Sequence, residues 1–208
     1  MKLLIAIPTL DFVHVDFMKC LVNLTNKLKD DGVRFEVGII SGTLVYVARD
    51  RLACKAINED FTHVLWLDSD MIFQPTILDD LLEAKKSFVT GIYHQRRPGY
   101  ASCIFKHCSE KNIERFEEYP KRTFRIEACG FGCVLITTDI LKQVQMHYKT
   151  CFCPLAQFGE DIAFCHRVLE LGMEIWCEPT VRCGHIGHNA VWPEDEARWK
   201  DNLIMGSQ

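Results

Sequence analysis

The sequence lacks the features that mark membrane, secreted and zinc-stabilised proteins. No run approaches the ~20 consecutive apolar residues that a membrane-spanning helix needs. The apolar opening, residues 1–10, is too short for a secretory signal, is interrupted by Pro8 and is followed by no small-residue cleavage site. No two cysteines have the C-x-x-C spacing that is usual in structural zinc sites. We therefore expect a soluble, cytoplasmic protein without a transmembrane segment.

The chain also has no excess of positive charge. Its 208 residues include 24 Lys and Arg against 28 Asp and Glu, which gives a net charge of −4. We therefore do not expect nucleic acid as a partner, because its recognition needs a basic surface. No internal repeat, low-complexity tract or linker is visible, and 48% of the residues are hydrophobic. This length and composition predict a single globular domain over residues 1–208.

Cysteine, in contrast, is frequent. There are 11 cysteines, an odd number, and most lie in apolar segments such as ACGFGCVLI, where a free thiol behaves as a small hydrophobic side chain. Without a secretory signal we interpret them as reduced. A zinc site is the competing interpretation, because Cys151 is close to Cys153 in sequence and Cys183 is close to His185 and His188.

Strands and helices alternate in the first half of the chain. Apolar runs of strand length occupy residues 3–7, 35–41, 63–67 and 87–93. Between them, the spacing of apolar residues predicts helices over 12–29 and 44–57 and a third that begins at Pro75. This alternation is typical of a parallel sheet covered by helices, and right-handed crossovers make a doubly wound, layered sandwich the expected architecture.

The second half of the chain is less regular. Residues 100–105 and 124–137 have strand-like patterns, and the charged stretch 106–122 between them is expected to be a solvated loop or hairpin. Helices are expected over 138–147 and 160–171, followed by a short strand over 173–177. The polar and aromatic tail from Trp192 indicates one amphipathic helix.

The first candidate site is Asp68-Ser69-Asp70, directly after an apolar strand. Residues i and i+2 of an extended backbone project to the same side, so we expect Asp68 and Asp70 to point together. In an open parallel sheet, ligands bind at the carboxyl ends of the strands, where this pair lies. Two carboxylates suit Mg²⁺ or Mn²⁺, with a substrate diphosphate completing the coordination. The alternative is a helix-capping turn before Pro75.

Two further segments carry groups that can do chemistry. Glu160 and Asp161 open an apolar helix, where acidic residues complement the helix dipole and where an ionised Asp161 can also act as a general base. The GHIGH segment near the end of the chain contains His185 and His188. A neutral imidazole beside carboxylates favours Mn²⁺ over Mg²⁺, and an ordinary surface histidine is the alternative.

Arginines and glycines complete the candidates. Arg49 precedes the Asp68 strand on a helix, and Arg96 and Arg97 follow the strand over 87–93. Such cations can neutralise the charge that develops on a departing diphosphate, although most surface arginines have no specific role. Gly130 and Gly132 flank a phenylalanine and form either a loop beneath a sugar or a simple turn between strands.

The whole series resembles nucleotide-sugar glycosyltransferases of the GT-A fold, near family 2, in their compact bacterial and phage form. The resemblance rests on these segments in this order: IAIPTLD, ARDRLACKAI, HVLWLDSDMIF, SFVTGIYHQRR, ACGFGCVLI, GEDIAFCHRVLELGMEIWCEP and RCGHIGH. It covers residues 3–188 and leaves the tail 189–208 out. It implies an α/β fold of the GT-A (Rossmann-like) type, a three-layer α/β/α sandwich with a mainly parallel central sheet.

The resemblance also implies roles for individual residues. Asp68 and Asp70 would hold Mn²⁺ or Mg²⁺ on the donor diphosphate, with His185 rather than His188 as a further ligand. Asp161 would be the catalytic base, and Glu160 would orient the acceptor. The residues expected to contact the nucleotide sugar are Pro8, Thr9, Asp11, Arg49, Asp68, Ser69, Gly130 and Gly132.

The implied reaction is transfer of a sugar from a UDP- or GDP-sugar to an acceptor hydroxyl, with inversion. The acceptor is not identified. Because the chain is short after the base, the acceptor site is either minimal or completed by a partner, and Trp192 and Trp199 could pack on a neighbouring subunit.

One alternative function is that of a sugar nucleotidyltransferase, but PTLDFVHVDF contains no glycine-rich phosphate loop. A non-catalytic protein that binds a sugar nucleotide or zinc is the other, and it would have no use for a base.

Overall fold

The predicted alternation of strands and helices is confirmed in a computed structural model that describes residues 1–187, 190–196 and 199. The helix after Pro75 begins two residues later than predicted, at Ile77, with Thr76 as its N-cap residue. The elements of the first half are β1 (Lys2–Pro8), α1 (Val15–Asp30), β2 (Arg34–Ile40), α2 (Val45–Asn58), β3 (His63–Leu67), β4 (Met71–Ile72), α3 (Ile77–Glu83) and β5 (Phe88–Ile92).

The strands of the second half differ in length from the prediction. Of the strand-like segments over 100–105 and 124–137, the first forms a strand only at its end and the second divides into three. The strand expected over 173–177 continues instead to Arg182. The elements are β6 (Ile104–Phe105), β7 (His107–Cys108), β8 (Ile113–Glu114), β9 (Phe124–Ile126), β10 (Ala128–Cys129), β11 (Cys133–Thr137), α4 (Thr138–Tyr148), α5 (Glu160–Glu170), β12 (Ile175–Arg182), β13 (Gly184–Ile186) and β14 (Ala190–Val191).

Seven strands of the described chain form one sheet, in the order β2-β1-β3-β11-β5-β12-β9. Strands β2, β1, β3, β5 and β12 run in one direction, and β11 and β9 run against them. The prediction of a mainly parallel central sheet is therefore confirmed. Because five strands share a direction, their carboxyl ends lie along one edge, which is where ligands bind in sheets of this kind.

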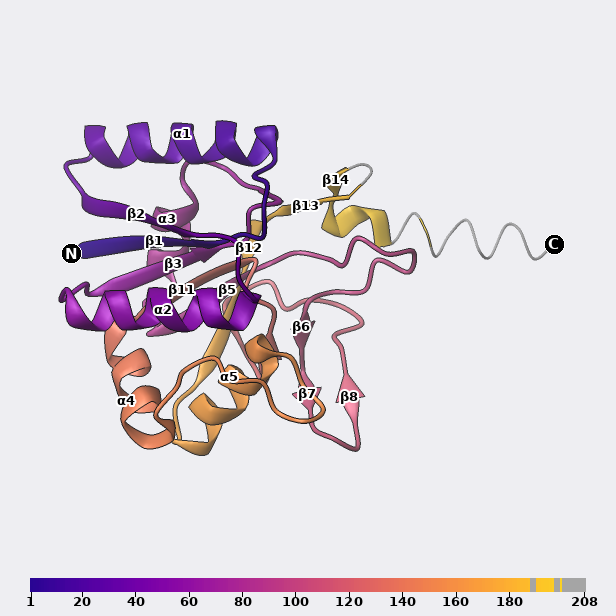
Figure 1. The fold of residues 1–208 in the computed structure, drawn as a ribbon. Helices are drawn as coiled ribbons and strands as arrows, with labels where there is room; N and C mark the ends of the chain where they lie inside the picture. Colours follow the sequence, from indigo (N-terminus) through magenta and orange to yellow (C-terminus); the bar gives the residue numbers. More distant parts are fainter. Residues whose placement is uncertain (188–189, 197–198, 200–208) are drawn as a thin grey trace.

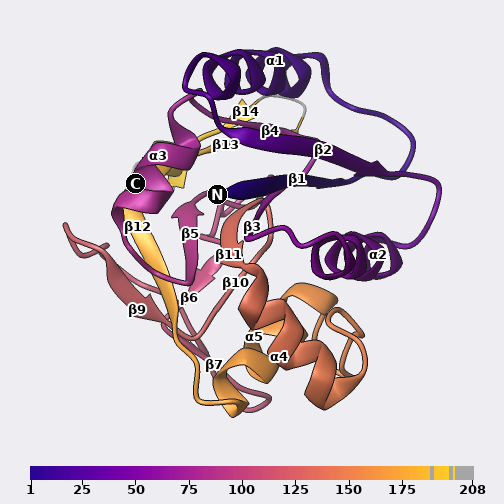
Figure 2. The same ribbon diagram turned by 90° about the vertical axis from the view of Figure 1, so that its left-hand side faces the viewer.

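Helices cover both faces of this sheet, so the predicted three-layer α/β/α sandwich is confirmed as well. Leu3, Ile5 and Ile7 of β1 pack in one apolar cluster with the buried faces of α1 and α3. Leu4 and Ala6 point the other way and pack with α2, α4 and α5. The alternation along β1 follows from the two-residue period of a strand. Figure 1 shows the layers from the side, and Figure 2 shows them along the strands.

The charged stretch over 106–122 is a small hairpin, as expected, but its end is not fully solvated. Strands β7 and β8 pair antiparallel. The aromatic rings of Phe116 and Tyr119 then turn inward and pack against the core cluster. The stretch looked polar because its charged residues surround these two rings in the sequence.

The tail can be described only in part. Residues 193–196 are helical, and Trp192 packs against Gly184 of β13 within the same chain.

All 11 cysteines are free thiols, and Cys153 is the exposed one among them. In the described part of the chain, no helix combines the length and the apolar character that crossing a bilayer would need.

Candidate active site

A cavity of about 750 Å³ lies at the carboxyl ends of β1, β3 and β5, on the side of the sheet where β6 and β13 are found (Figure 1). Ten of the residues singled out from the sequence line it: Pro8, Thr9, Arg49, Asp68, Ser69, Asp70, Arg96, Gly130, Asp161 and His185. Side chains that are far apart in the sequence therefore meet in one place, which is the edge of the sheet that the strand directions predict.

Asp68 and Asp70 both face the cavity, although the backbone between them is not extended. The amide N–H of Met71 donates to the carbonyl oxygen of Asp68 at 3.2 Å, so residues 68–70 form a turn between β3 and β4. Asp68 Oδ1 accepts a hydrogen bond from Arg49 Nη2 at 2.8 Å, and Asp70 Oδ2 accepts one from Arg96 Nη1 at 2.7 Å. A turn, rather than the strand alternation we expected, brings the two carboxylates to one side.

The environments of these two carboxylates shift their pKa values in opposite directions. Burial raises the pKa of Asp68 despite the opposing effect of Arg49. Burial acts in the same sense on Asp70, but the hydrogen bond and charge of His185 and the charge of Arg96 outweigh it, so the pKa of Asp70 is lowered. Asp70 is therefore the more firmly ionised of the two at neutral pH.

His185 reaches Asp70 through a strand pairing. β13 pairs antiparallel with β4, with His185 opposite Met71, and His185 Nε2 lies 3.6 Å from Asp70 Oδ2. His185 Nδ1 donates a hydrogen bond to the carbonyl oxygen of His94 at 2.8 Å. Nε2 therefore faces the carboxylate and either donates a proton to it, when the ring is charged, or offers a lone pair to a cation, when the ring is neutral. His188 lies outside the described residues.

Asp161 and Glu160 occupy the first turn of α5, as predicted. Asp161 lines the cavity, and its Oδ1 accepts a hydrogen bond from the amide N–H of Ile162 at 2.7 Å. Burial and the neighbouring carboxylate of Glu160 raise the pKa of Asp161 to about 6. Glu160 does not line the cavity and instead accepts a hydrogen bond from Arg49 Nε at 3.2 Å. A carboxylate with this pKa is ionised at neutral pH and basic enough to accept a proton.

Arg49 connects the two acidic groups. Its side chain extends from α2, is only 4% exposed, and bonds Asp68 with one nitrogen and Glu160 with another. Burial lowers the pKa of Arg49, but the charges of Asp68 and Glu160 outweigh this effect, so its pKa is raised. A buried guanidinium with two carboxylate partners fixes their relative positions, because losing either partner would leave a buried charge uncompensated.

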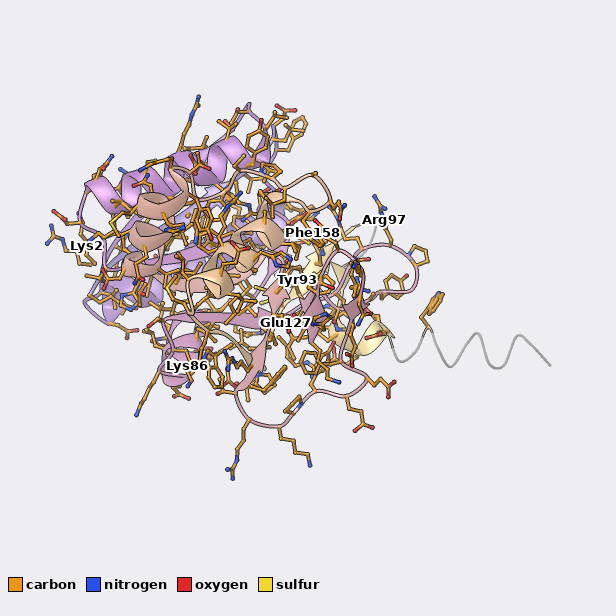
Figure 3. All side chains as sticks on the ribbon, turned by 90° about the horizontal axis from the view of Figure 1, so that it is seen from below. Lys2, Lys86, Tyr93, Arg97, Glu127 and Phe158 are labelled. Atoms are coloured by element: carbon orange, nitrogen blue, oxygen red, sulfur yellow. The ribbon has the colours of Figure 1, made fainter. Side chains whose placement is uncertain are left out.

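Tyr93 is a central residue that we did not select from the sequence. Its hydroxyl oxygen accepts a hydrogen bond from the amide N–H of Gly132 at 3.0 Å, and its ring meets the ring of His185 edge-on at 5.6 Å. Figure 3 labels Tyr93 within the molecule, far from Lys2 at the opposite end of the sheet. Its place after β5, at the carboxyl edge, is the signal in the sequence that could have identified it.

The glycines pack against Tyr93. A Cβ atom on Gly130 would lie 2.1 Å from the Tyr93 hydroxyl oxygen, and one on Gly132 would lie 2.8 Å from Tyr93 Cζ. Gly130 lines the cavity, whereas Gly132 lies behind it. Both glycines are required because the tyrosine occupies the space of a side chain.

The loops after β1 and β2 form the apolar mouth of the cavity. Leu10 lines it together with Thr43, Leu44 and Val45, and the last three were not selected from the sequence. Asp11, which the resemblance assigned to the nucleotide, is exposed and does not line the cavity.

The carboxylate oxygens and the imidazole nitrogen in this cavity are atoms that commonly bind divalent cations. Asp70 and His185 place a carboxylate oxygen and an imidazole lone pair beside each other, and metal-binding histidines commonly donate their other ring N–H to a carbonyl oxygen as His185 does. Arg49 forms ion pairs with Asp68 and Glu160, and Arg96 forms one with Asp70. In the part of the chain that is described, however, no three His, Cys, Asp or Glu side chains form a ready-made metal-binding group. Arginines contact the carboxylates instead.

Comparison with known proteins supports the fold. No model of a known protein family matches the sequence, and no curated protein matches it. The solved structure of A197 from STIV is similar over 93% of this chain and 91% of its own length, with a TM-score of 0.66 and 17% sequence identity. At that identity the similarity shows a shared α/β fold and nothing about activity.

Two further solved structures are less similar. One is a glycosyltransferase involved in the glycosylation of the major capsid of PBCV-1, with a TM-score of 0.37 and 14% identity over 72% of this chain and 66% of its own length. The other is a putative glucose-1-phosphate thymidylyltransferase from Bacillus anthracis, with a TM-score of 0.38 and 14% identity over 77% of this chain and 66% of its own. TM-scores this low support no argument about function.

Proposed function

We propose that this chain is a metal-dependent glycosyltransferase that moves a sugar from a UDP- or GDP-sugar to an acceptor hydroxyl, with inversion. One observation carries the proposal: a single cavity contains a carboxylate suited to act as a base, Asp161, together with the Asp70 and His185 pair. The sequence resemblance assigns these same residues to the base and to the metal. A protein that only binds a sugar nucleotide or a metal would have no use for the base.

Asp68, Asp70 and His185 would hold Mn²⁺ or Mg²⁺. When bound, the ion would neutralise charge on the donor diphosphate and on the nucleoside diphosphate that leaves. Arg49 would hold the Asp68 carboxylate in position through its hydrogen bond. Its second bond, to Glu160, ties the position of Asp68 to that of the base helix α5.

Asp161 would accept the proton of the acceptor hydroxyl. The acceptor oxygen then forms a bond to the anomeric carbon while the bond from that carbon to the diphosphate oxygen breaks, and the nucleoside diphosphate leaves with the electron pair. Attack from the face opposite the leaving group inverts the anomeric configuration. Stabilising the leaving diphosphate in the transition state and placing the acceptor precisely against the base would together supply most of the rate advantage.

The first experiment is a panel of UDP- and GDP-sugars assayed for Mn²⁺-dependent release of sugar or its transfer to small sugar acceptors. At least one donor should be turned over. Asp161→Asn should lower turnover by roughly 10²–10⁴-fold, the usual contribution of a general base, and should leave binding of UDP or GDP with Mn²⁺ intact. Asp30→Asn, at the exposed far end of α1, is the matched control and should behave like the wild type.

Other results would contradict the proposal. Unchanged turnover in Asp161→Asn would exclude this residue as the base. Binding of UDP and GDP that does not depend on Mn²⁺ or Mg²⁺ would exclude the metal. Release of pyrophosphate from a nucleoside triphosphate and a sugar phosphate would indicate a nucleotidyltransferase instead.

A further inference from the structure

One oxygen atom of the cavity has two nitrogen neighbours. Asp70 Oδ2 lies 2.7 Å from Arg96 Nη1 and 3.6 Å from His185 Nε2. The same Arg96 nitrogen lies 3.3 Å from the carbonyl oxygen of Ile186, the residue after His185. The guanidinium of Arg96 therefore contacts both the acidic turn and the strand that carries the histidine.

A cation shared by Asp70 and His185 would need this oxygen. His185 Nε2 faces Oδ2 of Asp70, so an ion held between the two side chains must contact Oδ2. The guanidinium of Arg96 already donates a hydrogen bond there, and two positive groups at one oxygen repel each other. Each positive group therefore weakens the binding of the other at Asp70 Oδ2.

The loop that carries Arg96 is fixed at its base and exposed at its tip. His94 is buried, and its Nδ1 donates to the carbonyl oxygen of Tyr100 at 2.6 Å while its Nε2 accepts from the Tyr119 hydroxyl at 2.9 Å. Residues 95–98 are exposed, and the side chain of Arg96 is 50% exposed. Its guanidinium can therefore change partners without disturbing the buried base of the loop.

We propose that Arg96 and the divalent cation compete for Asp70, and that the guanidinium displaced by the cation pairs with the donor diphosphate in the same cavity. This inference rests on the proposed function. It makes Arg96 a residue with two successive anionic partners, first the Asp70 carboxylate and then the phosphates. A diphosphate offers several acceptor oxygens that suit a forked guanidinium.

The proposal predicts effects of opposite sign for one substitution. Arg96→Ala removes the competitor for Asp70, so the variant should bind Mn²⁺ alone about 2–5-fold more tightly, as expected for a partly exposed ion pair. It also removes a phosphate partner, so UDP or GDP in saturating Mn²⁺ should bind roughly 10-fold more weakly. A residue that only stabilised the fold would weaken both.

Titration calorimetry on the full chain measures both constants, with Mn²⁺ first and then UDP and GDP as probes. Arg96→Gln, which keeps the polar side chain without the charge, is the second variant. Arg97→Ala is the matched control, because Arg97 lies next along the loop at the outer edge of the molecule (Figure 3) and does not line the cavity. It should change neither constant.

The possible failures can be told apart. If the wild type binds no Mn²⁺, the proposed function fails and this inference fails with it. If the wild type binds Mn²⁺ but both Arg96 variants bind it no more tightly, the competition is wrong while the proposed function stands. If Mn²⁺ binds more tightly but the nucleotide affinity is unchanged, the second partner is wrong.

Discussion

At the scale of single residues, Asp161 has the environment that a catalytic base requires. Its side chain lines the cavity, and burial beside Glu160 raises its pKa from an ordinary 3.8 to about 6. The amide N–H of Ile162 and the charge of Arg49 act in the opposite direction and keep the shift moderate. The group is therefore mostly ionised at neutral pH, yet more basic than a solvated carboxylate.

This pKa predicts a pH dependence of turnover. Only ionised Asp161 can accept the acceptor proton, so kcat should be constant above pH 7 and should fall as the pH drops through about 6, by about tenfold per pH unit below that. The measurement is kcat at saturating donor and Mn²⁺ between pH 4.5 and 8. A profile that stays flat down to pH 5 would contradict the assignment.

Much of the candidate site could be predicted at this scale. Asp68, Asp70 and Asp161 stand where a strand ends or a helix begins, and such junctions are visible in the sequence. Tyr93 was missed because its role depends on glycines some 40 residues later that leave room for its ring. Asp11 was selected by resemblance alone, and nothing in the sequence shows that its side chain does not line the cavity.

At the scale of elements, short strands and turns position the residues of the candidate site. The pairing of β4 with β13 brings His185 to Asp70, and the turn between β10 and β11 packs its glycines on Tyr93. Two- and three-residue strands have no readable periodicity, so neither pairing could be predicted. The long elements could be, because four or more apolar residues at regular spacing define a face.

The contact between Gly130 and Tyr93 predicts a coupling between two substitutions. Gly130→Ala should lower the free energy of unfolding by about 1–3 kcal/mol, since its Cβ atom would lie 2.1 Å from the Tyr93 hydroxyl oxygen. In Tyr93→Phe that oxygen is gone, so the same substitution should cost less, with a coupling energy of about 0.5–3 kcal/mol. Urea unfolding of the four proteins measures it.

Tyr119→Phe provides the control for this cycle. Tyr119 contacts His94 and does not contact Gly130, so the cost of Gly130→Ala should be the same in that background as in the wild type. An equal cost in the Tyr93→Phe background would show that the glycine is needed for some other reason.

At the scale of the whole molecule, two apolar layers enclose the sheet, and most cysteines belong to them. Seven of the 11 cysteines are buried, three are partly buried and Cys153 is exposed. Burial raises the pKa of Cys103 to about 12 and also raises that of Cys151, so these thiols stay protonated and unreactive. The cysteines therefore act in packing, as the apolar segments around them in the sequence predicted.

A thiol titration tests this arrangement. Ellman's reagent should label one thiol of the native protein rapidly, Cys153, and all 11 after unfolding in guanidinium without a reducing agent. Cys153→Ser should remove the rapid phase. Fewer than 11 reactive thiols in the unfolded wild type would reveal a disulfide and contradict the structure.

The pairing of β4 with β13 also bears on how the protein is made. Asp70 leaves the ribosome early in synthesis, but the histidine that stands beside it belongs to a strand that emerges more than 100 residues later. A nascent chain that stalls before β13 can build most of the sheet and still lack the imidazole. Competence for chemistry would then arise late and abruptly, when β13 pairs with β4 on a scaffold that has already formed.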